Sequence, residues 1–89
     1  MFKKEVIIVS ESGLHTRASA ELNQLANKFE SAVWISREGR KVNAKSITDL
    51  MTLGAGVGAT LSVEANGDDE RECVDAISRL IQDERGEVG

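Results

Sequence analysis

Apolar and polar positions follow two different spacings along this chain. Residues 60–65 alternate between apolar and polar side chains, which is typical of a strand with one buried face, here formed by Leu61, Val63 and Ala65. Three other short runs are rich in β-branched residues or flank a turn, and they predict further strands. These strands are expected at Glu5–Val9, Ala32–Ser36 and Arg40–Asn43, with Arg37–Gly39 as the turn of a hairpin.

Helical spacing occupies the segments between these strands. Apolar residues recur every three or four positions in two of them, and in the last the apolar face consists of Cys73, Val74, Ile77, Leu80 and Ile81. A shorter apolar segment between them follows a serine, a favourable N-cap, and a glycine can end it. The first helix is therefore expected from about Thr16 to about Phe29, and the second from its cap Ser46 to Leu53. The last helix should follow the turn and cap at Asn66–Asp69, and the tail should fray from about Glu84.

The order of elements is strand, helix, strand, strand, helix, strand, helix. Strands of period two, combined with helices that carry one apolar stripe, predict an α+β domain whose helices cover one face of a sheet. A chain of 89 residues is large enough for a single hydrophobic core, so one domain over residues 1–89 is expected. Cys73 is expected in that core, and Trp34 is expected to pack on the sheet.

Composition argues against several classes of function. With 15 acidic and 11 basic side chains the formal net charge is −4, and the chain lacks the basic balance that nucleic-acid binding requires. No apolar run is long enough to span a membrane, and the N-terminus lacks the apolar stretch of a signal peptide. One cysteine cannot form an internal disulfide, which fits a reducing compartment, so a cytoplasmic protein is expected. No residues have metal-ligand spacing, and neither a metal nor another cofactor is expected.

The chain's one histidine stands where a helix is predicted to begin. His15 follows Gly13 and precedes Arg17 within the stretch Ser12–Ser19. The first backbone N–H groups of a helix have no partner within it, and the positive end of its dipole attracts anions. An arginine adds a planar fork of donors suited to phosphate oxygens. These residues predict a histidine that carries or binds a phosphoryl group; the alternative is a histidine that only caps the helix.

Two motifs resemble those of a known family. Gly13-Leu14-His15-Thr16-Arg17 matches the active-site motif of HPr, the histidine phosphocarrier of bacterial sugar phosphotransferase systems, and Val42–Ile47 is similar to that family's second signature. Together with Met1–Val6, the resemblance covers nearly all 89 residues. It implies an open-faced sandwich in which three helices cover one face of a four-stranded antiparallel sheet, in the order β-α-β-β-α-β-α.

The resemblance also implies roles for the residues of the first motif. His15 would be the phosphohistidine, the side chain of Arg17 would stabilise the phosphate, and the backbone N–H of Thr16 would donate to it. The phosphoryl group would come from phosphorylated enzyme I and pass to IIA components, with the protein acting as a monomer. The sequence does not choose which ring nitrogen of His15 is phosphorylated.

In the second motif, Ser46 has two interpretations. Many relatives carry regulatory phosphorylation at the matching serine, placed there by an ATP-dependent HPr kinase/phosphorylase; the alternative is a serine that only caps a helix. The helix that follows has more apolar residues than so short an element can bury. We expect about two of them in the core and the rest in an exposed patch that docks partners, with Lys28 and Lys45 as a basic rim. The residues concerned are Ile47, Leu50, Met51 and Leu53.

Two departures from the family pattern bear on function. Ala18 replaces the usual proline, so the first turn of the helix is less rigid. Asp49 places a negative charge within the docking helix, where it should weaken association with acidic partners. Gln24 and Asn27 also lack positive charges found in some relatives. Three alternatives therefore stay open: a nitrogen-related branch of the same relay, a regulatory binding module controlled by Ser46, and a small α+β binding domain without phosphoryl transfer.

Overall fold

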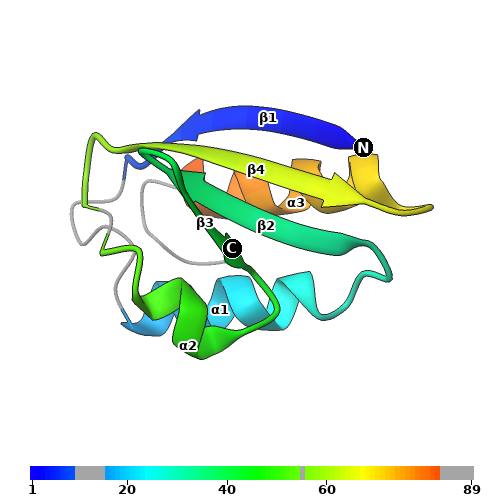
Figure 1. Ribbon diagram of the computed structural model, residues 1–89, viewed down its shortest axis with the longest axis horizontal. Helices are drawn as coiled ribbons and strands as arrows, with labels where there is room; N and C mark the ends of the chain where they lie inside the picture. The colour runs from blue at the N-terminus through cyan, green and yellow to red at the C-terminus, as the bar shows by residue number, and fades with distance from the viewer. Residues whose placement is uncertain (10–15, 55, 83–89) are drawn as a thin grey trace.

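The computed structural model describes residues 1–9, 16–54 and 56–82 of the chain. The described part contains a four-stranded sheet with strand order β1-β4-β2-β3, in which every pair of neighbours is antiparallel. The expected element order and the α+β open-faced sandwich are confirmed (Figure 1). In chain order the elements are β1 (Phe2–Ile7), α1 (Thr16–Ala26), β2 (Ala32–Arg37), β3 (Arg40–Asn43), α2 (Ile47–Met51), β4 (Thr60–Asn66) and α3 (Glu70–Gln82).

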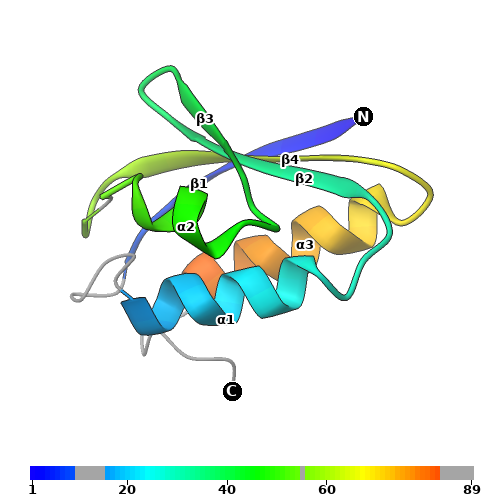
Figure 2. The ribbon, with the colours of Figure 1, turned by 60° about the horizontal axis from the view of Figure 1, so that its bottom comes forward.

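One face of the sheet is covered by the helices, and the other is open (Figure 2). Because side chains alternate along a strand, every second residue of β2 and β4 points to the covered face. Val33 and Ile35 of β2 are buried there, as are the expected residues of β4, namely Leu61, Val63 and Ala65. From the other side, Leu22 and Ala26 of α1 and the whole predicted apolar face of α3 complete the core.

The first strand and the first helix have different ends from those expected. Strand β1 begins at Phe2 rather than Glu5, because residues 2–7 pair with residues 65–60 of β4. Helix α1 ends at Ala26 rather than near Phe29, because the N–H groups of Lys28 and Phe29 bond carbonyls only three residues back. These tighter bonds are typical of a helix end. Phe29 still packs against the core, which is why the apolar pattern continued past the helix.

The second helix is shorter than expected and begins as expected. Ser46 is its N-cap, since the Ser46 hydroxyl accepts a hydrogen bond from the N–H of Asp49 at 3.3 Å. The helix ends at Met51, with Thr52 as C-cap, before Leu53 is reached. Gly54 then has a φ of +59°, a left-handed conformation that favours glycine. The tail from Glu84 lies outside the described residues.

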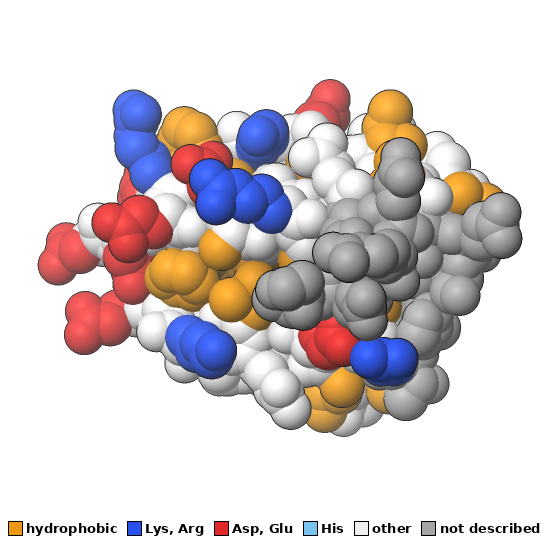
Figure 3. All heavy atoms as spheres, turned by 180° about the vertical axis from the view of Figure 1, so that it is seen from behind, with side chains coloured by type: hydrophobic (Ala, Val, Ile, Leu, Met, Phe, Trp, Pro, Cys, Tyr) orange, Lys and Arg blue, Asp and Glu red, His pale blue; other side chains and the backbone are white. Residues whose placement is uncertain are grey.

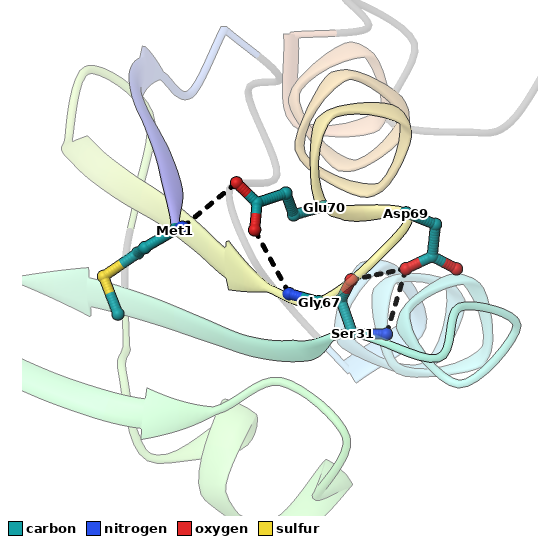
Figure 4. A network of polar contacts seen from close by, with 5 residues as sticks. All are labelled: Met1, Ser31, Gly67, Asp69 and Glu70. Carbon is teal, nitrogen blue, oxygen red and sulfur yellow. Dashed lines mark hydrogen bonds and ion pairs between the residues drawn. The ribbon is translucent and has the colours of Figure 1, made fainter.

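A network of polar contacts joins the turn before α3 to two other parts of the chain (Figure 4). The carboxylate of Asp69 accepts hydrogen bonds from the N–H groups of Glu30 at 2.9 Å and Ser31 at 3.0 Å, and from the Ser31 hydroxyl. The carboxylate of Glu70 accepts from the N–H of Gly67 at 3.2 Å and pairs with the α-ammonium of Met1 at 3.1 Å. The start of α3 therefore positions both the beginning of β2 and the chain's N-terminus.

Candidate functional site

The candidate site is centred on the first turn of α1. Thr16 is the first residue of this helix, so its N–H has no helical carbonyl four residues earlier to bond. His15, which directly precedes it in the chain, lies outside the described residues. Ser19, on the same turn, is fully buried, and its hydroxyl has no hydrogen-bond partner among the described residues. The predicted helix start is thus confirmed directly after the histidine.

Arg17 is paired with a carboxylate that the motif does not include and that the sequence reasoning missed. Its side chain is 69 % exposed, and its Nε donates to Oε1 of Glu21 at 3.3 Å, one helical turn further along. The Glu21 side chain is only 23 % exposed, and its second oxygen, Oε2, is buried and has no hydrogen-bond partner within the part of the chain that the structure describes. The spacing of four residues on a predicted helix is a signal that could have indicated this pair.

The four apolar residues proposed for partner docking separate into two groups. Leu50 and Leu53 are 0 % and 4 % exposed and pack in the core, as expected for two of the four. Their assignment as docking residues is therefore corrected, since a buried side chain offers no surface to a partner. Ile47 and Met51 are 36 % and 50 % exposed, one turn apart on α2. These two residues form the exposed apolar face of α2.

Lys45 and Ser46 lie beside α1. The ammonium of Lys45 donates to the carbonyl of Phe29 at 2.7 Å, so its charge is held beside the segment that follows α1. Asn23 of α1 donates to the carbonyl of Ala44 at 3.2 Å, and Asn27, directly after the helix, donates to the carbonyl of Lys45 at 3.5 Å. These bonds, together with the packing of α1 against α2, hold the second motif next to the first helix (Figure 1).

The far end of α2 is braced by the β2–β3 hairpin. Arg40 donates from Nη2 to the hydroxyl of Thr52 at 2.8 Å, and this hydroxyl donates to the carbonyl of Asp49 at 2.6 Å. The guanidinium of Arg37 donates to the carbonyl of Leu53 at 3.4 Å. Both arginines therefore bring positive charge to the C-terminal end of a helix, where it is favourable. Lys28 is exposed.

Acidic side chains gather at one end of the molecule, around the turn between β4 and α3 (Figure 3). Asp68, Asp69, Glu70 and Glu72 line a shallow hollow there. Part of the net negative charge is thus concentrated at the opposite end from the start of α1 (Figure 2).

The described residues that remain carry no further reactive group at this site. Cys73 is buried on α3, and burial raises the pKa of its thiol to about 11, so it stays protonated at neutral pH, as expected of a core cysteine. Trp34 packs on the open face of the sheet with the Lys41 ammonium 4.9 Å from its ring centre.

In residues 1–9, 16–54 and 56–82 no three potential ligands lie close enough to hold a metal ion. No helix in these ranges is long and apolar enough to cross a bilayer.

Comparison with known proteins identifies the family. The model of the PTS HPr component phosphorylation site matches residues 2–83. The chain belongs to the HPr family. It is 48 % identical to the phosphocarrier protein HPr of Cupriavidus necator over 87 residues, which are 98 % of each chain. The resemblance inferred from the two motifs is thereby confirmed.

Solved structures of HPr proteins have the same fold. The crystal structure of HPr-C-His from Thermoanaerobacter tengcongensis superimposes with a TM-score of 0.91 at 39 % identity, covering 100 % of both chains. An HPr dimer from the same organism has a TM-score of 0.71 at 44 % identity, covering 88 % of this chain and 92 % of that one. The open-faced sandwich described above is therefore the HPr fold.

Proposed function

We propose that this HPr-family protein accepts a phosphoryl group on His15 from phosphorylated enzyme I and passes it to a IIA component. The observation that carries the proposal is the position of the motif: its histidine directly precedes the first residue of α1, and the matched family model describes a phosphorylation site. The rest of the motif supplies an N–H at Thr16 and an exposed guanidinium at Arg17.

The proposed transfer needs only the imidazole as nucleophile. The lone pair of the unprotonated ring nitrogen of His15 forms a new P–N bond, and the donor's imidazole leaves with the electron pair of the P–N bond that breaks. Atoms and charges balance without water, a metal or a nucleotide at this site. The transfer to a IIA histidine is the same step with His15 as the leaving group.

The helix end and Arg17 would stabilise the phosphoryl group in this protein. Three anionic oxygens gain from N–H donors, from the positive end of the α1 dipole and from a guanidinium. The dipole contributes only about 0.3–1 kcal/mol at an exposed helix end. Modest stabilisation suits a carrier, because a phosphoryl group held too tightly is not passed on.

Docking would use the exposed apolar face of α2. Ile47 and Met51 are the described apolar side chains of α2 that a partner can cover, and Lys28 supplies an exposed cation at the end of α1. Asp49 is exposed on the same short helix and would repel an acidic partner. We infer that association is weak and transient, as a relay protein that serves several partners requires.

Intact-mass analysis tests the function directly. The protein is mixed with enzyme I, phosphoenolpyruvate and magnesium, beside a His15→Ala control. We expect one acid-labile phosphoryl adduct that is absent from the control. Acceptance only from the nitrogen-type enzyme I would place the protein in that branch. No adduct with either donor, while both phosphorylate another carrier, would leave His15 as a helix cap and overturn the proposal.

A further inference from the structure

Glu21 is the residue of the candidate site for which the family motif gives no role. It lies one turn beyond Arg17 on α1, and its Oε1 accepts from the guanidinium Nε at 3.3 Å. The arginine is in the first turn, where the helix dipole disfavours a cation, and that turn contains no acidic residue. The dipole therefore disfavours the positive charge of Arg17. Within the described part of the chain, the carboxylate of Glu21 is a group that offsets this charge.

The second oxygen of Glu21 is not in contact with solvent. Oε2 is buried and accepts no hydrogen bond from residues 1–9, 16–54 or 56–82, while the side chain as a whole is 23 % exposed. Water screens the charge of this carboxylate less than that of a fully exposed one, so its field acts more strongly on neighbouring groups. A buried, unsatisfied oxygen also costs stability, and its retention beside a functional arginine calls for an explanation.

We propose that Glu21 is a positioning residue that sets, through Arg17, how strongly the phosphoryl group is held. This inference rests on the proposed function. In the unphosphorylated protein Glu21 holds the guanidinium; on phosphorylation its negative charge competes with the phosphoryl oxygens for that same guanidinium. The competition weakens retention of the phosphoryl group and so favours its onward transfer.

The test is the equilibrium of phosphoryl transfer between enzyme I and this protein, measured by intact mass at low salt. Glu21→Gln keeps an oxygen that can accept from Arg17 and removes the charge. We expect the equilibrium to shift toward the phosphorylated carrier by about two- to fivefold, the range for one partly exposed ion pair. Glu21→Asp keeps the charge, so its transfer equilibrium should be closer to that of the unmodified protein than the equilibrium of Glu21→Gln is.

A matched control removes the same charge elsewhere. Glu72 is exposed in the first turn of α3, at the other end of the molecule from the start of α1 (Figure 2), and Glu72→Gln should leave the equilibrium unchanged. In an Arg17→Gln background the effect of Glu21→Gln should disappear, because the proposed action passes through the guanidinium.

The outcomes separate this inference from the proposed function. If the unmodified protein accepts no phosphoryl group, the proposed function fails. If it accepts one but Glu21→Gln behaves like Glu72→Gln, the role of Glu21 alone is overturned. A shift that persists in full without Arg17, or an aspartate variant that behaves like the glutamine variant, also overturns it.

Discussion

The carboxylate of Asp69 bonds both the backbone N–H and the hydroxyl of Ser31, a residue 38 positions earlier in the chain. The same carboxylate accepts from the N–H of Glu30 at 2.9 Å. One side chain thereby satisfies two N–H groups of the segment that enters β2 and fixes that segment to the beginning of α3. Hydrogen bonds to a charged acceptor are a strong local constraint, because charge-assisted bonds exceed neutral ones in strength.

Replacing Asp69 should lower stability and change its pH dependence. The hydroxyl of Ser31 and then the N–H of Glu30 hold the pKa of Asp69 below its ordinary value of 3.8. Because this pKa is lower in the folded state, the stability that the Asp69 carboxylate contributes is complete above the pKa of the unfolded state. It is lost as pH falls through the pKa of the folded state. The free energy of unfolding in urea should therefore decline in the unmodified protein as pH falls from 7 to 3. The decline should be smaller in Asp69→Asn, which starts from a lower stability at pH 7.

Asp68→Asn is the control for that experiment, since the neighbouring side chain is exposed. It should keep the native pH profile. An Asp69→Asn protein with unchanged stability at pH 7 would show that the Ser31 contact contributes nothing.

Gly67 should not tolerate a side chain. A Cβ added at this position would lie 2.7 Å from the Cα of Ser31, closer than two such carbons can approach, so the backbone there must move. We expect Gly67→Ala to lower the free energy of unfolding by about 1–3 kcal/mol, as overpacking does. Gly56→Ala meets nothing within 4 Å and should be close to neutral in the same denaturation assay. Equal stabilities for the two variants would contradict the close approach of Gly67 to Ser31.

The two sides of α2 should respond differently to truncation. Leu50 is fully buried, so Leu50→Ala should cost about 2–5 kcal/mol of stability through the lost burial and the cavity left behind. Met51 is 50 % exposed, so Met51→Ala should change stability by less than about 0.5 kcal/mol. The same Met51 variant should bind enzyme I more weakly by titration calorimetry if α2 is the docking face. Unchanged affinity would place the docking surface elsewhere.

Ser46 should act as a cap whether or not it is modified. Ser46→Ala removes the acceptor for the Asp49 N–H and should cost about 0.5–2 kcal/mol, whereas Ser46→Asp should restore capping. The added charge beside Asp49 should nevertheless slow phosphoryl transfer from enzyme I, because acidic partners are repelled. Stopped-flow transfer rates and thermal unfolding separate the two effects. A Ser46→Asp protein with native transfer rates would argue against control by phosphorylation at this serine.

Much of this architecture follows from local sequence. The alternation of Leu61, Val63 and Ala65 places them on one face of any strand, and the apolar stripe of α3 faces inward in any helix that packs on a sheet. The cap at Ser46 and the helix start at Thr16 are also local, since a cap depends on residues within one turn. For the same reason the amino-acid sequence alone places the phosphocarrier motif at a helix start.

Tertiary structure decided the features that depend on distant partners. A helix of five residues is too short for its periodicity to separate Leu50 from Met51; only the packing of α2 against α1 and β3 determines which is buried. Strand β1 begins at Phe2 because β4 supplies hydrogen bonds there, although the side chains of residues 3–5 are polar. The contacts of Asp69 with Ser31 and of Lys45 with Phe29 join residues 38 and 16 positions apart. No local pattern encodes such pairs, because the two residues meet only when the whole chain has folded.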